Sequence, residues 1–414
     1  MSDGTRADAR IPNGAKDVLP VEIAELRAIE QRWRAHVQAA GYREVRTPIL
    51  EYARVIDRAQ ADASGEAYRL FDDDGSVLVL RPALTFPVAR LVPPRRPDHP
   101  GRVRASSFAG AFHPPRLGRP RPGEVRQAGI ELVGASRPGA DAEVIALLAG
   151  SLQAAGVRAP RINVGDVSLT RAVMDALDID APLRAALGTA LAERDLVNWR
   201  DRVNAALPAG TTRELLAELP ALRGDTQLLE RIRTALPAVA PACDALADTI
   251  ELAQRHGHGV HVSIDLGALR DWSYYSGIVL EAYGPGASEP LAVGGRYDAL
   301  GARFGTPRSA VGFAIALDQV HRAVLAAAPA ERLPNDGIVL VGGLDTHIEQ
   351  AAAARAAGIA VIALAADDAQ RAEPLAQADN WRHVVWPQPN GDFVALDRLD
   401  GSRRTVAVLQ EVVG

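Results

Sequence analysis

The spacing of apolar residues predicts a helix followed by strands in the first part of the chain. Apolar side chains recur at helical intervals from Pro20 to Trp33, and Gly41 is placed to end that helix. Residues 42–50 are expected to form an extended strand. The apolar run at 77–80 is expected to be another strand, because Pro82 cannot continue a central ladder.

The middle of the chain changes from strand-like to helical patterns. Residues 102–134 predict two antiparallel strands around a loop at 114–123 that is rich in proline and arginine. A helix is expected at 141–155, and the pattern at 168–256 is almost entirely helical, which indicates an inserted helical subdomain. Further strands are expected at 260–266, 277–283 and 291–294, and residues 311–327 are expected to be mostly helical.

The last part of the chain has a different pattern, with a boundary near residues 329–335. Beyond it a strand at 338–341 and a helix at 346–357 predict a small α/β module. Gly342 and Gly343 follow the first strand, where they could cradle a phosphate or simply form a tight turn. The remaining strands are expected at 361–364, 384–386, 393–396 and 405–409.

Composition narrows the class of protein. The 414 residues are 48% hydrophobic and 23% charged, with a net charge of −5, and Lys16 is the only lysine. This balance is ordinary for a soluble protein and argues against a dedicated polynucleotide binder. Cys243 is the single cysteine, which excludes an internal disulfide or a cysteine-rich metal site. We see no signal peptide and no membrane-spanning run, so a cytoplasmic location is expected.

The segment 269–275 is dense in polar and aromatic groups. Arg270 is suited to a carboxylate, because its guanidinium fork can bond two oxygens at once. Tyr274 and Tyr275 could supply a flat wall with hydroxyl ends. A packed turn with surface charges is the alternative interpretation.

Glu131 lies in the middle of a predicted strand between apolar neighbours. A carboxylate that points into a sheet is costly unless it has a partner, so either a ligand or a structural salt bridge is expected there. The arginines of the preceding loop could contact an anion or partner, or could simply be solvated; they are Arg116, Arg119, Arg121 and Arg126.

Several motifs, in order, resemble those of histidyl-tRNA synthetases, a family of class II aminoacyl-tRNA synthetases, over roughly residues 10–325. The resemblance implies an α+β fold, with an antiparallel sheet flanked by helices. It implies a synthetase-like domain at 1–330 with a helical insertion at about 168–258, and a small C-terminal α/β domain at 336–414. The segment 45–51 resembles the dimer-forming motif 1. The other matching segments are 13–20, 80–85, 127–134, 270–277, 294–300 and 312–320.

The resemblance also implies how the amino acid histidine would bind. Thr85 and Gln127 would contact its α-amino group. Glu131 and Tyr275 would contact the imidazole nitrogens, with Tyr274 beside them, and Arg270 would face the carboxylate. The family usually has an acidic residue where Ala83 stands, which weakens the expected recognition of the amino group.

The nucleotide side departs further from the synthetase pattern. The two positions where the family holds ATP with arginine are His113 and Gln319 here. Losing one such charge costs on the order of 10²–10³ in rate. This profile resembles the regulatory subunits of ATP phosphoribosyltransferase, a family of synthetase paralogues.

That second resemblance implies a non-catalytic subunit with no cofactor and no tRNA. It implies a short-form catalytic subunit as partner, with which the chain forms a hetero-octamer. It further implies self-association through the class II dimer interface, and L-histidine as the effector that inhibits the first step of histidine biosynthesis. The alternatives are an active histidyl-tRNA synthetase, or a synthetase-like binding module with another partner.

Overall fold

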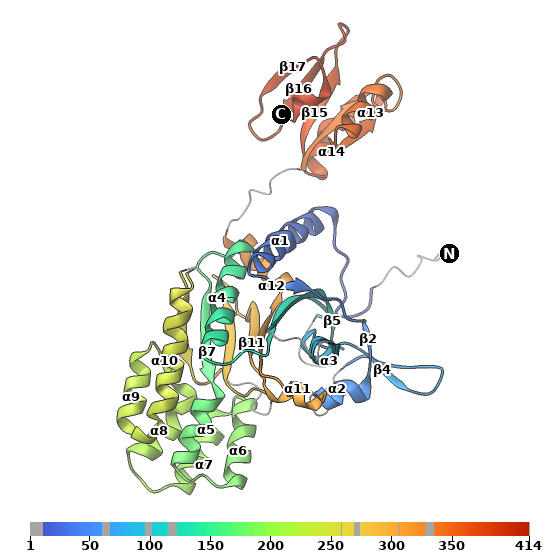
Figure 1. The fold of residues 1–414 in the computed structure, drawn as a ribbon. Coiled ribbons are helices and arrows are strands. Elements are labelled where there is room, and N and C mark those ends of the chain that lie inside the picture. The colour runs from blue at the N-terminus through green and yellow to red at the C-terminus, as the bar shows by residue number, and fades with distance from the viewer. Residues whose placement is uncertain are drawn as a thin grey trace, which may run out of the picture. The chain divides into compact units, whose positions relative to one another are not determined.

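The computed structural model describes residues 11–59, 67–95, 102–114, 122–257, 259–268, 274–305, 307–327 and 335–413. It consists of two compact units (Figure 1). One is formed by Met1–Val18 and Ile23–Ala328, and the other by Leu19–Glu22 and Pro329–Gly414. No described helix is long and apolar enough to cross a membrane.

A mixed, largely antiparallel sheet forms the centre of the first unit. In spatial order its strands are β1 (Arg43–Glu44), β5 (Val103–Phe112), β6 (Glu124–Val133), β12 (Ala310–Ala316), β11 (Ala292–Arg296), β10 (Ile278–Tyr283), β7 (Arg161–Asp166), β9 (His261–Asp265) and β8 (Arg223–Gly224). Only the pairs β1–β5 and β7–β9 are parallel within this sheet. The expected hairpin of residues 102–134 is present as β5 and β6.

The two faces of this sheet differ because side chains alternate along each strand. On β6, Ala128, Ile130 and Leu132 are fully buried in the main core. That core also includes residues of α1 (Pro20–Ala39), α4 (Gly139–Ala154) and α12 (Leu317–Ala327). Gln127 and Glu131, which alternate with these residues along the strand, therefore lie on the opposite face.

Two expected elements differ from the structure. Residues 310–316 form β12 and not the start of a helix, because this segment is paired on both sides, with β6 and with β11. Residues 42–50 do not form one strand. Pro48 has no N–H to donate, and Arg81 instead bonds the carbonyl oxygens of Thr47 and Pro48 at 2.8 and 3.0 Å.

A second, three-stranded sheet packs with short helices beside the first. Its order is β2 (Leu50–Tyr52), β4 (Val77–Leu80) and β3 (Arg69–Phe71). A small core joins it to α2 (Ala53–Ala59), α3 (Thr85–Arg95) and α11 (Ala299–Arg303). This core brings the start of α3 to the central sheet.

The segment between β7 and β9 is almost entirely helical. Its helices are α5 (Val167–Ala176), α6 (Ala181–Ala192), α7 (Leu196–Ala206), α8 (Thr211–Glu218), α9 (Gln227–Ala235) and α10 (Ala240–Arg255), and they gather as a bundle in Figure 1. Asp166, Asp180 and Asp195 cap the first three of them. Trp199 is fully buried, and its indole N–H donates to the Leu216 carbonyl oxygen at 2.7 Å.

The second unit is a small sheet with short helices on both faces. Its strands follow the order β14 (Val361–Leu364), β13 (Asn335–Val341), β15 (Trp381–Pro387), β16 (Phe393–Asp397) and β17 (Arg403–Val406). One core includes residues of α13 (Ile348–Ala356), and the other includes residues of α14 (Ala372–Ala378). The N–H groups of Thr346 and His347 donate to the Gly342 carbonyl oxygen at 2.9 and 2.7 Å, which makes the glycine pair part of a tight turn.

Candidate functional site

Glu131 lies on the face of β6 that points away from the main core, between strands that carry very small residues. It is opposite Ala105 of β5 and Gly312 of β12. A Cβ atom at Gly312 would lie only 2.0 Å from Oε2 of Glu131. Glycine at this position therefore provides the room that the carboxyl group occupies.

The surroundings of Glu131 disfavour its charged form. The residue is 5% exposed. Burial raises the pKa of Glu131 to about 8, and a hydrogen bond with the Thr85 side chain opposes this rise only in part. Within the described residues, neither Oε2 of Glu131 nor the buried Oε1 of Gln127 has a hydrogen-bond partner. Buried acceptors without partners are uncommon, and here two of them lie on one face of one strand.

An aromatic wall stands beside this part of the sheet. We call Tyr274–Gly277 the tyrosine segment. The Tyr274 ring stacks on Tyr297 with 5.4 Å between centroids and meets Tyr275 edge-on at 4.9 Å. A Cβ atom at Gly295 would lie 2.7 Å from Cε1 of Tyr275, so this ring rests directly on the strand. Gly295 is paired with Gly312, which is paired with Glu131.

The structure therefore brings together most of the residues expected to bind histidine. Thr85 and Glu131 are hydrogen-bonded. Gln127 lies on the same face of β6 as Glu131, and both tyrosines pack near the neighbouring strands. Ala83 packs against the small core beside them. Arg270 lies outside the described residues.

The two nucleotide positions carry no guanidinium in the described structure. The backbone N–H of His113 donates to the Gly123 carbonyl oxygen at 2.9 Å, where the β5–β6 loop begins. Gln319, in the first turn of α12, donates its amide N–H to Glu289 at 2.8 Å. A neutral amide bonded to a carboxylate does not supply positive charge to a phosphate. The loop residues Arg116, Arg119 and Arg121 are outside the described residues.

A buried ion-pair group behind the tyrosine segment was not anticipated from the sequence. Arg296 is 1% exposed and bonds Asp141 at 2.5 Å and Asp298 at 2.9 Å. Burial alone would lower the pKa of Arg296, but its hydrogen bonds and charge interactions with Asp141 and Asp298 together raise it. Arg296 was visible in the Gly-Gly-Arg motif, but nothing local indicated that its partner would be on α4.

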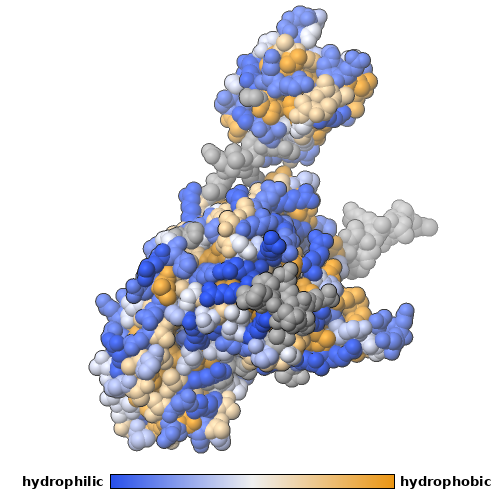
Figure 2. Space-filling view, in the orientation of Figure 1, coloured by the Kyte–Doolittle hydropathy of each residue, from blue (hydrophilic) through white to orange (hydrophobic). Residues whose placement is uncertain are grey.

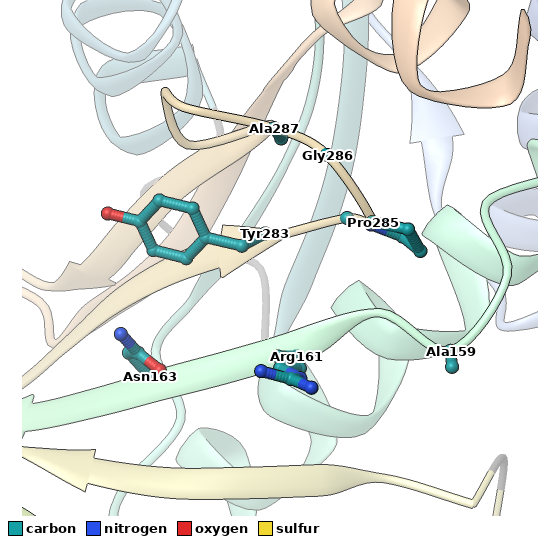
Figure 3. Close-up of a pocket in the computed structure, with 8 residues that line it drawn as sticks. Ala159, Arg161, Asn163, Tyr283, Pro285, Gly286 and Ala287 are labelled. Atoms are coloured by element: carbon teal, nitrogen blue, oxygen red, sulfur yellow. The ribbon is translucent and has the colours of Figure 1, made fainter. Parts of the chain in front are cut away.

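A separate groove of about 600 Å³ lies at the far ends of β7 and β10 (Figure 3). Arg161 and Asn163 of β7 and Tyr283 of β10 line it, together with the turn Gly284–Ala287. The Tyr283 hydroxyl donates to buried Glu281 at 2.6 Å. Among the described residues, the groove included, no group of three His, Cys, Asp or Glu side chains is arranged to hold a metal ion.

The family model described as histidyl-tRNA synthetase matches residues 14–320. An ATP phosphoribosyltransferase regulatory subunit from Moorella thermoacetica is 37% identical over 89% of this chain and 95% of that protein. The corresponding subunit from Rubrobacter xylanophilus is 36% identical over 91% of each chain.

Solved structures of similar proteins have the same fold as this chain. A Bacillus halodurans protein described as an ATP phosphoribosyltransferase regulatory subunit/histidyl-tRNA synthetase aligns with a TM-score of 0.80 at 27% identity. The alignment covers 92% of this chain and 99% of that one. Histidyl-tRNA synthetase from Nostoc sp. PCC 7120 aligns with a TM-score of 0.80 at 19% identity, over 97% of each chain, which shows a shared fold.

Proposed function

This chain belongs to the family of ATP phosphoribosyltransferase regulatory subunits, and on that premise we propose that it activates a short catalytic subunit and inhibits it when L-histidine binds. The observation that carries the proposal is the pair of buried acceptor atoms on Gln127 and Glu131, which have no partner among the described residues. We call the proposed binding site around them the Glu131 pocket. Such acceptors are suited to a small ligand that donates hydrogen bonds.

Histidine matches this pocket chemically. In the proposed complex the Glu131 carboxylate accepts from an imidazole N–H, and Tyr275 contacts the ring from the side of β11. Thr85 and Gln127 contact the α-amino group, and Arg270 faces the carboxylate. A carboxyl group and a phenol on either side of the ring select imidazole over apolar rings. Inhibition of the partner is limited by the difference in histidine affinity between the two states of the complex.

The loss of phosphate-binding charge supports a non-catalytic role. Stabilising the transferring phosphate requires preorganised positive charge, and the corresponding positions are His113 and a Gln319 bonded to Glu289. The C-terminal region supports the absence of a tRNA role. Residues 335–414 contain six arginines, eleven acidic residues and no lysine, a balance that repels a polyanion.

Two assays on the purified chain test this function. We expect histidine binding by calorimetry, together with no histidine-dependent exchange of pyrophosphate into ATP. Glu131→Ala should weaken histidine binding by at least about tenfold. The exposed Glu193→Ala provides a matched control. Robust exchange would instead identify an active synthetase, and unchanged affinity in Glu131→Ala would move the histidine site elsewhere.

Exposed apolar residues on the two outer strands of the small sheet, β2 and β3, support self-association of the chain. Leu50, Leu70 and Phe71 are 44%, 41% and 79% exposed, and Figure 2 shows hydrophobic surface over the β2 region. Exposed apolar groups that cluster in this way are typical of interfaces. We propose that the dimer contact lies here and that this dimer assembles further into a hetero-octamer with four catalytic subunits. We also propose that the complex acts in a reducing cytoplasm, where the single, buried Cys243 remains a free thiol.

Mass measurement tests the assembly. Wild type should be a dimer by light scattering, and Phe71→Glu should shift it towards monomer because a charge is then buried in an apolar contact. The substitution Val197→Glu, at another exposed apolar residue, is the control and should leave the mass unchanged. Native mass spectrometry with the catalytic subunit then reports the stoichiometry. A monomeric wild type, or a Phe71→Glu variant that remains a dimer, would contradict this interface.

A further inference from the structure

A group of charged side chains joins the tyrosine segment to the base of the helical insertion. Arg137 donates from Nη2 to the carbonyl oxygen of Ser276 at 3.2 Å and from Nη1 to the hydroxyl of Ser168 at 3.0 Å. Its guanidinium also lies 3.6 Å from Asp141 and 4.0 Å from Asp166. One planar side chain therefore contacts the loop, the first turn of α5 and the carboxylates between them.

Gly277 provides the room that this arrangement needs. A Cβ atom there would lie 1.6 Å from Nη2 of Arg137, so a larger residue would displace the guanidinium. The Gly277 carbonyl oxygen accepts from the N–H of Val167 at 2.9 Å, at the start of α5. The tyrosine segment is thus bonded to α5 both through its own main chain and through Arg137.

The first turn of α5 is organised around the same contacts. Asp166 caps the helix by accepting from the N–H groups of Ser168 and Leu169 at 2.6 and 3.2 Å. Arg171, one turn further along, donates to the Tyr275 carbonyl oxygen at 3.4 Å. A change in the position or order of the tyrosine segment therefore acts on the cap and on the first turn of this helix.

We propose that Arg137 is a positioning residue that transmits occupancy of the Glu131 pocket to the helical insertion. The inference rests on the proposed function, because it takes histidine as the occupant. Histidine held between Glu131 and Tyr275 orders the tyrosine segment, and Arg137 extends that order to Asp166 and Ser168. The helical insertion is then the part of the chain that responds to the effector, through a change in order and without a contact to histidine.

A purely structural role for Arg137 makes a different prediction. A structural ion pair would stabilise α5 equally with and without histidine, and its loss would lower stability in both states. A positioning role requires that the response of α5 to histidine depends on Arg137. The distinguishing quantity is therefore the histidine-induced change in amide exchange of α5, not its absolute protection.

Hydrogen–deuterium exchange on the full chain, with and without saturating histidine, measures this quantity. In wild type we expect histidine to slow exchange in the tyrosine segment and in Val167–Ala176. Arg137→Ala should bind histidine about tenfold more weakly and should lose the α5 response. Arg137→Lys keeps a positive charge near Asp166 but lacks the planar fork, so it should remain folded and also lose the response.

Arg184→Ala is the matched control. It removes an arginine that pairs with Asp175 at 2.6 Å in the same helical insertion, outside the Arg137 contacts, and it should respond to histidine as wild type does. An unchanged α5 response in the Arg137→Lys variant would overturn the transmission role and leave the histidine site intact. Absence of histidine binding by wild type in calorimetry would overturn both this inference and the proposed function.

Discussion

Replacing Glu131 with glutamine tests the electrostatic state of the pocket. Burial raises the pKa of Glu131 from 4.5 to about 8 in the folded protein. Between these values the unfolded chain has lost the proton while the folded protein keeps it. The folded state therefore holds more protons, and its stability falls as the pH rises from 4.5 through about 8.

The magnitude follows from the same two values. A tenfold difference in proton affinity corresponds to about 1.4 kcal/mol, so the change from 4.5 to about 8 sets an upper limit of about 5 kcal/mol. Glutamine has nearly the same shape and does not titrate in this range. Glu131→Gln should therefore match wild type in acid and exceed its free energy of unfolding by several kcal/mol in mild alkali.

Urea unfolding without histidine, repeated between about pH 5 and about pH 9, measures the difference. All other titratable groups are common to the two proteins, so their effects cancel in the comparison. The exposed Glu193→Gln controls for the loss of one negative charge from the whole protein. A stability difference that does not grow with pH would mean that Glu131 is already ionised in the empty pocket, and the reasoning from burial would be wrong.

Three further predictions follow from the pocket and its support. Histidine binding near pH 7 should release close to one proton from Glu131. The measured binding enthalpy should then depend on the ionisation enthalpy of the buffer, and a binding enthalpy that is the same in all buffers would contradict this prediction. Gly312→Ala should abolish histidine binding and lower stability by about 1–3 kcal/mol, because its Cβ would overlap Glu131, whereas Gly139→Ala, with open space around it, should be neutral. Arg296→Ala should cost up to about 3–5 kcal/mol in urea unfolding, because it leaves buried Asp141 with only the more distant Arg137, 3.6 Å away, as a charged partner. A loss below about 1 kcal/mol would exclude a structural role for the pair.

Local sequence patterns were sufficient to predict some of the secondary-structure elements. The β5–β6 hairpin is an example, because two strand-like runs on either side of a loop rich in proline and arginine are visible in the chain. The helix expected from residue 311 was wrong over 311–316, because the central position of this segment in the sheet, not its periodicity, makes it a strand. Helix α3 was not anticipated, since Thr85–Arg95 contains three prolines, residues that usually break a helical pattern.

The candidate site likewise has some features that the sequence reveals and others that only the packing of the chain reveals. The chemistry of Glu131 and the absence of arginine at positions 113 and 319 are properties of residue type, so the sequence alone reveals them. The partnership of Arg296 with Asp141 is different, because an arginine beside glycines carries no sign of a carboxylate on a distant helix. Arg296 can be interpreted as a residue that stabilises the fold only once its burial is known, and burial is defined by the packing of the whole chain.

For this protein, the order of its motifs and the identity of its charged residues were enough to indicate a synthetase-like fold with a weakened nucleotide site. The tertiary structure alone joins Thr85 to Glu131, rests Tyr275 on Gly295, and connects Arg137 to the main chain of the tyrosine segment. These contacts are between segments far apart in the chain. They depend on strand register and on the space that glycine residues leave, and local secondary-structure propensity encodes neither of these.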